Sequence, residues 1–139
     1  MQIAFQQEDT LGKKISVVGL GVVFIVAGLN HFINPNFYMD MMPPYLPAHL
    51  MLIYLSGVAE IVGGVAVLVA KWRKWAGYFL ILVTLAVFPA NIYMAQNAIQ
   101  FADVAPAWAL YLRLPLQFAL IFWIYMTAIH SGENQKGKR

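Results

Sequence analysis

Four long apolar segments dominate the sequence, at residues 15–33, 50–70, 75–96 and 107–129. Each is close to the roughly 20 residues that an α-helix needs to cross the hydrocarbon core of a bilayer. Of the 139 residues, 61% are hydrophobic and only 11% are charged, whereas a soluble domain has about 25% charged residues. A soluble domain of this size could not bury so much apolar surface. The segments predict an all-α, polytopic membrane protein, a bundle of four transmembrane helices.

The connections between these segments are too short to hold a second domain, so residues 1–139 are expected to form a single membrane domain. The connection at residues 34–49 contains Pro43 and Pro44, which cannot lie inside a regular helix and favour extended backbone. Its aromatic residues, Tyr38 among them, suit the interface between lipid and water. We expect this connection to be a cap at the outer membrane surface, above the polar residues described below.

The basic residues indicate an orientation. Eight of the nine lie before the first segment, between the second and third, or in the tail: Lys13, Lys14, Lys71, Arg73, Lys74, Lys136, Lys138 and Arg139. With four spans these positions share one side, and Lys and Arg accumulate in cytoplasmic loops. Both termini are therefore expected in the cytoplasm. The same distribution makes the lipid bilayer the expected partner and argues against nucleic acid, despite the net charge of +3.

The ninth basic residue, Arg113, lies inside the fourth apolar segment. It is about six residues, or ~9 Å, from the outer end of that segment. A charge near the middle of a membrane helix costs about 2.5–3.5 kcal/mol on insertion scales, so such residues usually face the bundle and find a partner. Reaching back to the interface is the alternative for an arginine. Gln117, one turn deeper on the same face, favours the bundle interior.

Glu60 is the one acidic residue within an apolar segment. Small residues lie about one turn to either side, spaced to share its face: Ser56, Gly57, Gly63 and Gly64. Such residues mark close packing between membrane helices, so Glu60 is expected to point into the bundle. A buried carboxylate either takes up a proton or pairs with a cation. Arg113 lies at a depth that both side chains can span, and we predict that the two pair directly or through water.

Two further polar residues lie near segment ends. His31 is near the end of the first segment, and Asn91 is toward the end of the third. Each by itself is more often a hydrogen-bonded interior group than a ligand. With Glu60, Arg113 and Gln117 they come from four segments and converge on the outer half, which predicts a ligand-binding pocket. Pro89 lies two residues before Asn91, and Pro115 lies two residues after Arg113. Both prolines are expected to kink their helices. Kinks beside polar residues also occur in transporter sites, and a packing role is the alternative.

The sequence contains no cysteine, so a thiolate metal site is excluded. Methionines of the 34–49 connection could join His31 and His49 as soft ligands for Cu(I), but methionine commonly fills gaps in apolar packing. No metal site is predicted. No nucleophile with an evident base is present, so catalytic residues are not assigned and a self-contained enzyme is not expected.

Five motifs occur in order: "GLNHFINP", "MMPPYLP", "SGVAEIVGG", "FPANIYMA" and "RLPLQ". This ordered set resembles the DoxX-like family of small bacterial four-helix membrane proteins, over roughly residues 20–125. The resemblance implies a location in the bacterial inner membrane. It also carries over His31, Glu60, Asn91, Arg113 and Gln117 as the recurring polar positions of that family, without a chemical role. The lack of cysteine departs from relatives tied to dithiol chemistry.

Three functions follow as alternatives. In the first, the chain is a small subunit or scaffold of a membrane redox assembly, with a partner redox protein or a second copy of itself, and its outer pocket binds a quinone or a similar amphiphile. In the second, the same polar residues and kinked helices form the site of a small-solute carrier or channel. In the third, the polar residues only fix the register of the helices in a structural or chaperone-like protein.

Overall fold

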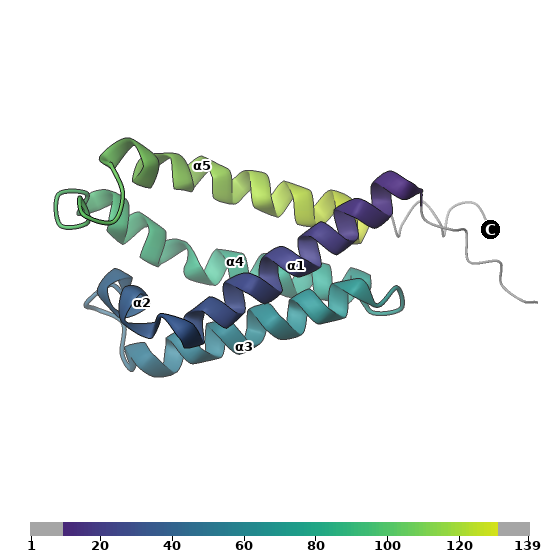
Figure 1. The fold of residues 1–139 in the computed structure, drawn as a ribbon, viewed down its shortest axis with the longest axis horizontal. Helices are drawn as coiled ribbons and strands as arrows, with labels where there is room; N and C mark the ends of the chain where they lie inside the picture. Colours follow the sequence, from purple (N-terminus) through teal and green to yellow (C-terminus); the bar gives the residue numbers. More distant parts are fainter. Residues whose placement is uncertain (1–9, 131–139) are drawn as a thin grey trace, which may run out of the picture.

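The computed structural model describes residues 10–130. Over this range the chain is helical, with four helices long and apolar enough to cross a membrane (Figure 1). They are α1 (Leu11–Ile33), α3 (His49–Leu68), α4 (Arg73–Gln96), and α5 (Ala107–Ile124) with the π-helix η1 (Tyr125–His130) that continues it. The predicted all-helical fold is confirmed for these residues. The predicted segments match the helices closely, the largest difference being that α1 begins at Leu11 instead of residue 15.

The connection after α1 contains a short helix that the sequence analysis did not predict. This helix, α2 (Pro35–Met41), begins with a proline at its first position, where the missing N–H costs nothing and the fixed φ suits a helix. Irregular backbone follows over residues 42–48, as expected from Pro43 and Pro44. Ala48, with a φ of 49°, then precedes the first turn of α3. We call the end of the bundle that carries α2 the cap end, and the opposite end the terminal end.

Helices α1 and α3 approach each other at two pairs of glycines. A Cβ atom added to Gly28 would lie 2.6 Å from the carbonyl oxygen of Gly57, and one added to Gly64 would lie 2.9 Å from the carbonyl oxygen of Gly21. Only residues without a side chain allow two backbones to come so close, as in other membrane helix pairs. The prediction that small residues mark a packing face of the third helical segment is confirmed.

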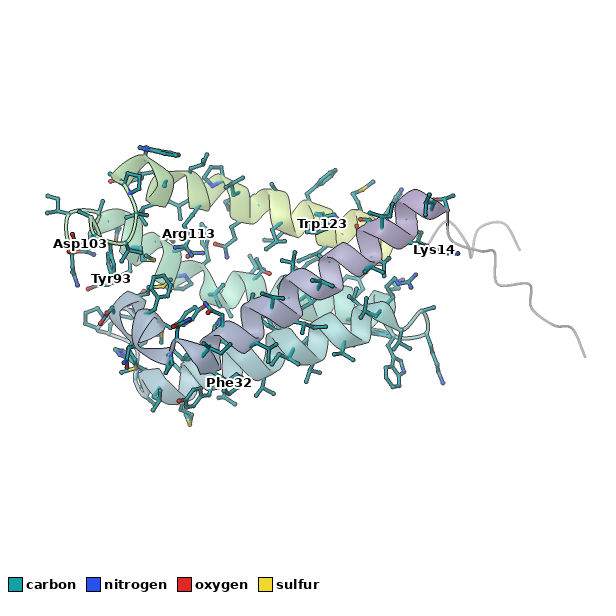
Figure 2. The ribbon with its side chains drawn as sticks, viewed as in Figure 1. Lys14, Phe32, Tyr93, Asp103, Arg113 and Trp123 are labelled. Carbon is teal, nitrogen blue, oxygen red and sulfur yellow. The ribbon has the colours of Figure 1, made fainter. Side chains whose placement is uncertain are left out.

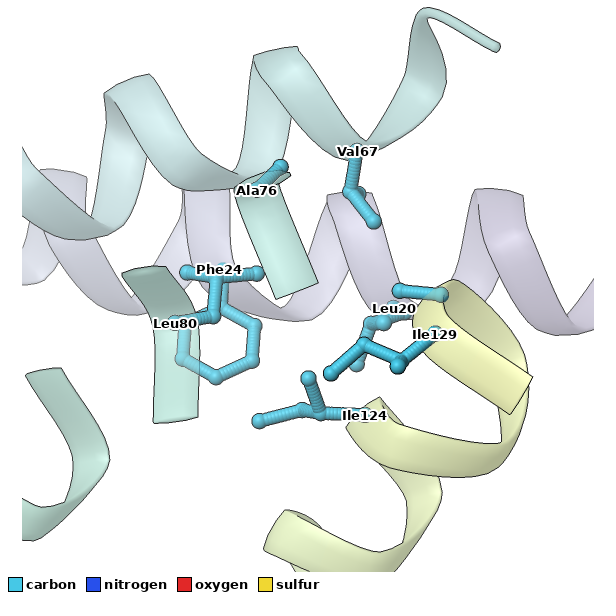
Figure 3. Close-up of a cluster of buried hydrophobic side chains, with 8 residues drawn as sticks. Leu20, Phe24, Val67, Ala76, Leu80, Ile124 and Ile129 are labelled. Carbon is cyan, nitrogen blue, oxygen red and sulfur yellow. The ribbon is translucent and has the colours of Figure 1, made fainter. Parts of the chain in front are cut away.

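The terminal half of the bundle has a continuous apolar core. It joins α1, α3, α4, α5 and η1 through eight buried side chains: Leu20, Phe24, Val67, Ala76, Leu80, Ile124, Ala128 and Ile129 (Figure 3). A small polar group lies beside it, where Ser16 Oγ is 2.7 Å from Thr127 Oγ1 and accepts a hydrogen bond from Trp123 Nε1 at 2.8 Å. These contacts tie α1 to the fourth long helix at this end.

Toward the cap end, α1 and α5 diverge (Figure 1). Helix α1 stays against α3, while α5 stays against α4. A second apolar cluster closes this end: Met41 of α2, Met94 of α4, Phe101 of the following turn and Leu110 of α5. The polar residues predicted for the outer half lie between this cluster and the apolar core.

Candidate functional site

The imidazole ring of His31 is positioned by a hydrogen bond at one nitrogen and by stacking on one face. It lies in the last turn of α1, is buried, and its Nδ1 is 2.9 Å from the backbone carbonyl oxygen of Ile53 in α3. A carbonyl oxygen only accepts hydrogen bonds, so Nδ1 carries the hydrogen and donates it. Tyr38 of α2 stacks on the ring, with centroids 4.0 Å apart. The orientation of the imidazole therefore directs Nε2 toward α3.

That nitrogen faces Glu60. Nε2 of His31 lies 3.3 Å from Oε2 of Glu60, whose side chain is buried within the bundle. The contact is longer than a good hydrogen bond, and Oε2 has no hydrogen-bond partner among the described residues. The interaction is therefore an electrostatic one between two buried groups. A buried ion pair is present, but the direct pairing of Glu60 with Arg113 was wrong: in the described part of the chain Glu60 pairs with His31.

The contact determines how many protons His31 Nε2 and Glu60 Oε2 hold between them, in addition to the hydrogen on Nδ1. If both Nε2 and Oε2 lacked a proton, two lone pairs would face each other in a buried site, which is unfavourable. One proton on the pair removes this conflict, either as imidazolium with carboxylate or as imidazole with carboxylic acid. In both forms the pair has no net charge.

Gln117 and Asn91 form a second linked unit, between α4 and α5. Asn91 Nδ2 donates to Gln117 Oε1 at 2.6 Å. Gln117 Nε2 in turn donates to the backbone carbonyl oxygen of Thr84. This carbonyl lies one residue before that of Leu85, which lacks its helical donor because Pro89 has no N–H. The buried amide of Gln117 thus spans the segment of α4 that leads into the proline.

Arg113 lies one turn nearer the cap end than Gln117 and points from α5 toward the interior of the bundle (Figure 2). It is half-buried, and its Nη1 is 3.3 Å from Met94 Sδ. A thioether sulfur is a weak acceptor with no charge. No carboxylate in residues 10–130 forms an ion pair with Arg113 at 4.0 Å or less. Other N–H donors of the guanidinium are therefore available to hydrogen-bond a ligand.

A cavity of about 230 Å³ collects most of these groups. Its polar wall consists of Glu60, Thr84, Asn91, Arg113 and Gln117, and its apolar wall of Phe24, Val87, Leu116 and Leu120. Four of the five predicted site residues thus line one space, and the fifth, His31, lies behind Glu60. The cavity is bordered by α1, α3, α4 and α5. Leu116, which lines it, is 54% exposed on the apolar outer surface of α5, so the cavity reaches that surface.

Tyr38 and Thr84 belong to the site but were not predicted as site residues. The Tyr38 hydroxyl accepts a hydrogen bond from Asn30 Nδ2 at 2.7 Å, and the ring covers His31. Burial raises the pKa of Tyr38 above its usual value, so the phenol stays neutral at physiological pH. Tyr38 was expected at the membrane interface from its residue type. The proline at the start of α2 was the available signal that this ring belongs to a short helix.

No group of three or more His, Cys, Asp or Glu side chains within residues 10–130 is arranged to hold a metal ion. The two histidines of the Cu(I) alternative each face a backbone carbonyl: His31 that of Ile53, and His49 that of Pro43 at 3.1 Å. These contacts account for the placement of both rings without a ligand.

No curated protein and no solved structure matches the chain. A family model described as "Domain of unknown function (DUF8561)" matches residues 20–128, a range that holds both walls of the cavity and the His31–Glu60 pair. The chain belongs to this family.

Proposed function

We propose that the protein is a multi-pass protein of a bacterial inner membrane, with both ends of the chain in the cytoplasm and the cap end facing outward. Four sufficiently long apolar helices support the membrane location. The basic residues near the start of α1, and those in the turn after α3 and at the start of α4, lie at the terminal end of the bundle (Figure 1), and this is the distribution typical of a cytoplasmic side.

In this setting the cavity binds the headgroup of a small amphiphile. The main support for this proposal is the cavity of about 230 Å³. It has a polar wall with Arg113, Asn91 and Gln117, an apolar wall, and an edge at the apolar surface of α5. An apolar cavity of about 150 Å³ holds benzene, so a ring with polar substituents fits, whereas drug-sized ligands need about 300–1,000 Å³. A tail attached to the headgroup would leave past Leu116 between the acyl chains of the bilayer.

A quinone is the amphiphile that we propose. It combines a ring of suitable size with two carbonyl oxygens, which accept hydrogen bonds from donors such as the Arg113 guanidinium, and with an apolar tail. The resemblance to DoxX-like proteins supports the same reading, in which the chain is a membrane subunit or scaffold of a redox assembly. The electron-transfer group would then belong to a partner redox protein.

The test uses the full chain in phosphatidylcholine nanodiscs and menadione, a methylated naphthoquinone, as the probe. Equilibrium dialysis with subtraction of protein-free nanodiscs measures specific binding. A tryptophan in place of Leu116 fills the edge of the cavity, and Leu82→Trp is the matched control, because Leu82 is 64% exposed on α4 and does not line the cavity. We expect Leu116→Trp to weaken menadione binding at least tenfold and Leu82→Trp to leave it unchanged. Equal binding to all three proteins would reject a quinone site in this cavity.

A structural role is the second candidate, because several polar groups of the site are already bonded within the protein. His31 donates to the Ile53 carbonyl and Gln117 to the Thr84 carbonyl, contacts that fix the helices relative to one another. This role does not account for the free donors of Arg113 beside an open cavity. It predicts that the variants of the cavity edge leave every binding measurement unchanged.

A further inference from the structure

The charge balance of the cavity identifies the kind of headgroup it takes. Six acidic residues occur in the sequence, and three of them, Asp40, Glu60 and Asp103, lie in the part that the structure describes. Asp40 and Asp103 are exposed, and neither forms an ion pair with Arg113. Glu60 is the remaining carboxylate, and it faces His31.

Glu60 does not offset the charge of Arg113. Because Nδ1 of His31 donates to the Ile53 carbonyl, the pair of His31 and Glu60 holds one proton and is neutral as a unit. A negative charge on Glu60 is thus matched by the imidazolium beside it.

The other elements around the cavity add no negative charge. Helix α2 contributes the Tyr38 hydroxyl, which is neutral at physiological pH because the pKa of a tyrosine is about 10 and burial raises it further. Helix α4 contributes Thr84 and Asn91, which do not ionise, and Met94, which is the acceptor for Arg113. The cavity and its surroundings, within residues 10–130, therefore carry one net positive charge, on the guanidinium of Arg113.

We propose that the ligand of this cavity is an anionic amphiphile, whose negatively charged oxygens bind the guanidinium of Arg113. This inference rests on the proposed amphiphile site and narrows it to an acidic headgroup, such as an ionised hydroxyquinone, a carboxylate or a phosphate. An arginine offers a planar fork of donors that matches paired anionic oxygens, and hydrogen bonds between ionised groups are about twice as strong as neutral ones. Asn91 and Gln117 lie on the same wall and orient the remainder of the headgroup.

The closing experiment compares two naphthoquinones of nearly the same size. Lawsone carries a hydroxyl conjugated to the quinone carbonyl, so it is an acid that is ionised at neutral pH, whereas menadione carries a methyl group and is neutral. Both are measured by equilibrium dialysis against the full chain in phosphatidylcholine nanodiscs, with protein-free nanodiscs subtracted. We expect lawsone to bind at least about tenfold more tightly than menadione, because hydrogen bonds to charged groups are stronger than those to neutral carbonyls.

Variants of Arg113 test whether its charge causes the difference in affinity between lawsone and menadione. Arg113→Gln, which keeps a neutral donor, should remove the preference for lawsone by weakening lawsone binding more than menadione binding, whereas Arg113→Lys, which keeps the charge, should retain part of the preference. Lys14→Gln, at an exposed site near the start of α1, lowers the net charge equally and should change nothing. A wild-type size-exclusion profile and helical circular dichroism spectrum show that Arg113→Gln is folded.

A second arm separates the sources of the anion. Nanodiscs that contain phosphatidylglycerol present a phosphate headgroup at high concentration. Competition with lawsone in these discs supports a lipid phosphate as the natural ligand, and unchanged binding supports a free acidic amphiphile; both outcomes agree with an anionic headgroup. Equal affinity for lawsone and menadione would overturn this inference and leave the quinone site standing. Failure of both probes to bind would overturn the two proposals together.

Discussion

Gly28 of α1 and Gly57 of α3 face each other across one of the two close contacts between these helices. A Cβ at position 28 would lie 2.6 Å from the carbonyl oxygen of Gly57, and one at position 57 would lie 2.9 Å from that of Gly28. His31 and Glu60 each lie three residues after one of these glycines, so they flank this contact. The absence of two side chains thus allows the buried ionisable pair to form.

The first prediction concerns this contact. Gly28→Ala should destabilise the protein by about 1–3 kcal/mol, because the added methyl group meets backbone atoms that cannot rotate away. Gly12→Ala is the matched control in the same helix, since a Cβ there has no heavy atom within 4 Å, and alanine is the better helix former. The measurement is the free energy of unfolding in a detergent titration with sodium dodecyl sulfate. An equal, small effect of both changes would contradict the close approach of α1 and α3.

A double-mutant cycle tests the buried pair. His31→Leu or Glu60→Leu alone should lower the free energy of unfolding by about 3–5 kcal/mol, because each leaves the other group buried without its partner. The double variant should lose less than the sum of the two, by a coupling energy of about 0.5–3 kcal/mol. His49→Leu combined with Glu60→Leu is the control and should be additive, because His49 contacts the Pro43 carbonyl. Additivity of both combinations would argue that His31 and Glu60 do not interact.

Gln117 is predicted to stabilise the segment of α4 that leads into its proline. Gln117→Leu leaves the Asn91 amide without its acceptor and removes a side-chain donor from the Thr84 carbonyl, and an unpaired buried group costs about 1–3 kcal/mol. Gln96→Leu makes the same chemical change at an exposed site at the end of α4. Hydrogen exchange measured by mass spectrometry should show faster exchange near residues 84–91 in Gln117→Leu, but not in Gln96→Leu. Unchanged exchange in this segment would argue against the role of Gln117.

Tyr38 gives a prediction for alkaline pH. Its pKa is raised by burial in the folded state, so above the usual value near 10.0 the phenol ionises in the unfolded chain before it does so in the folded protein. The unfolded state then binds fewer protons, and stability falls as pH rises through this range. The melting temperature of the wild type should therefore fall more steeply above about pH 10 than that of Tyr38→Phe. Tyr45→Phe, at an exposed tyrosine of the same connection, should keep the wild-type slope.

The sequence alone determined the number and placement of the long helices. An apolar run of about 20 residues has few alternatives to a spanning helix, because its backbone polar groups must be satisfied within the segment. The faces of those helices also followed from the sequence, since Gly57 and Gly64 mark one side of α3 through the helical period alone. Their similar depth in different segments predicted that Glu60, Asn91, Arg113 and Gln117 share one cavity, and all four line it.

Which of these residues pair with each other was decided only by the tertiary structure. Depth along the helices made Arg113 a plausible partner for Glu60, but depth does not state which helix lies next to α3. The glycine contacts bring α1 against α3, so His31 reaches Glu60, while α5 diverges from α1 toward the cap end and Arg113 contacts Met94 instead. The fold of α2 onto His31 likewise depends on contacts between distant residues. Local periodicity fixes each helix face, whereas close packing between backbones selects the neighbour that each face meets.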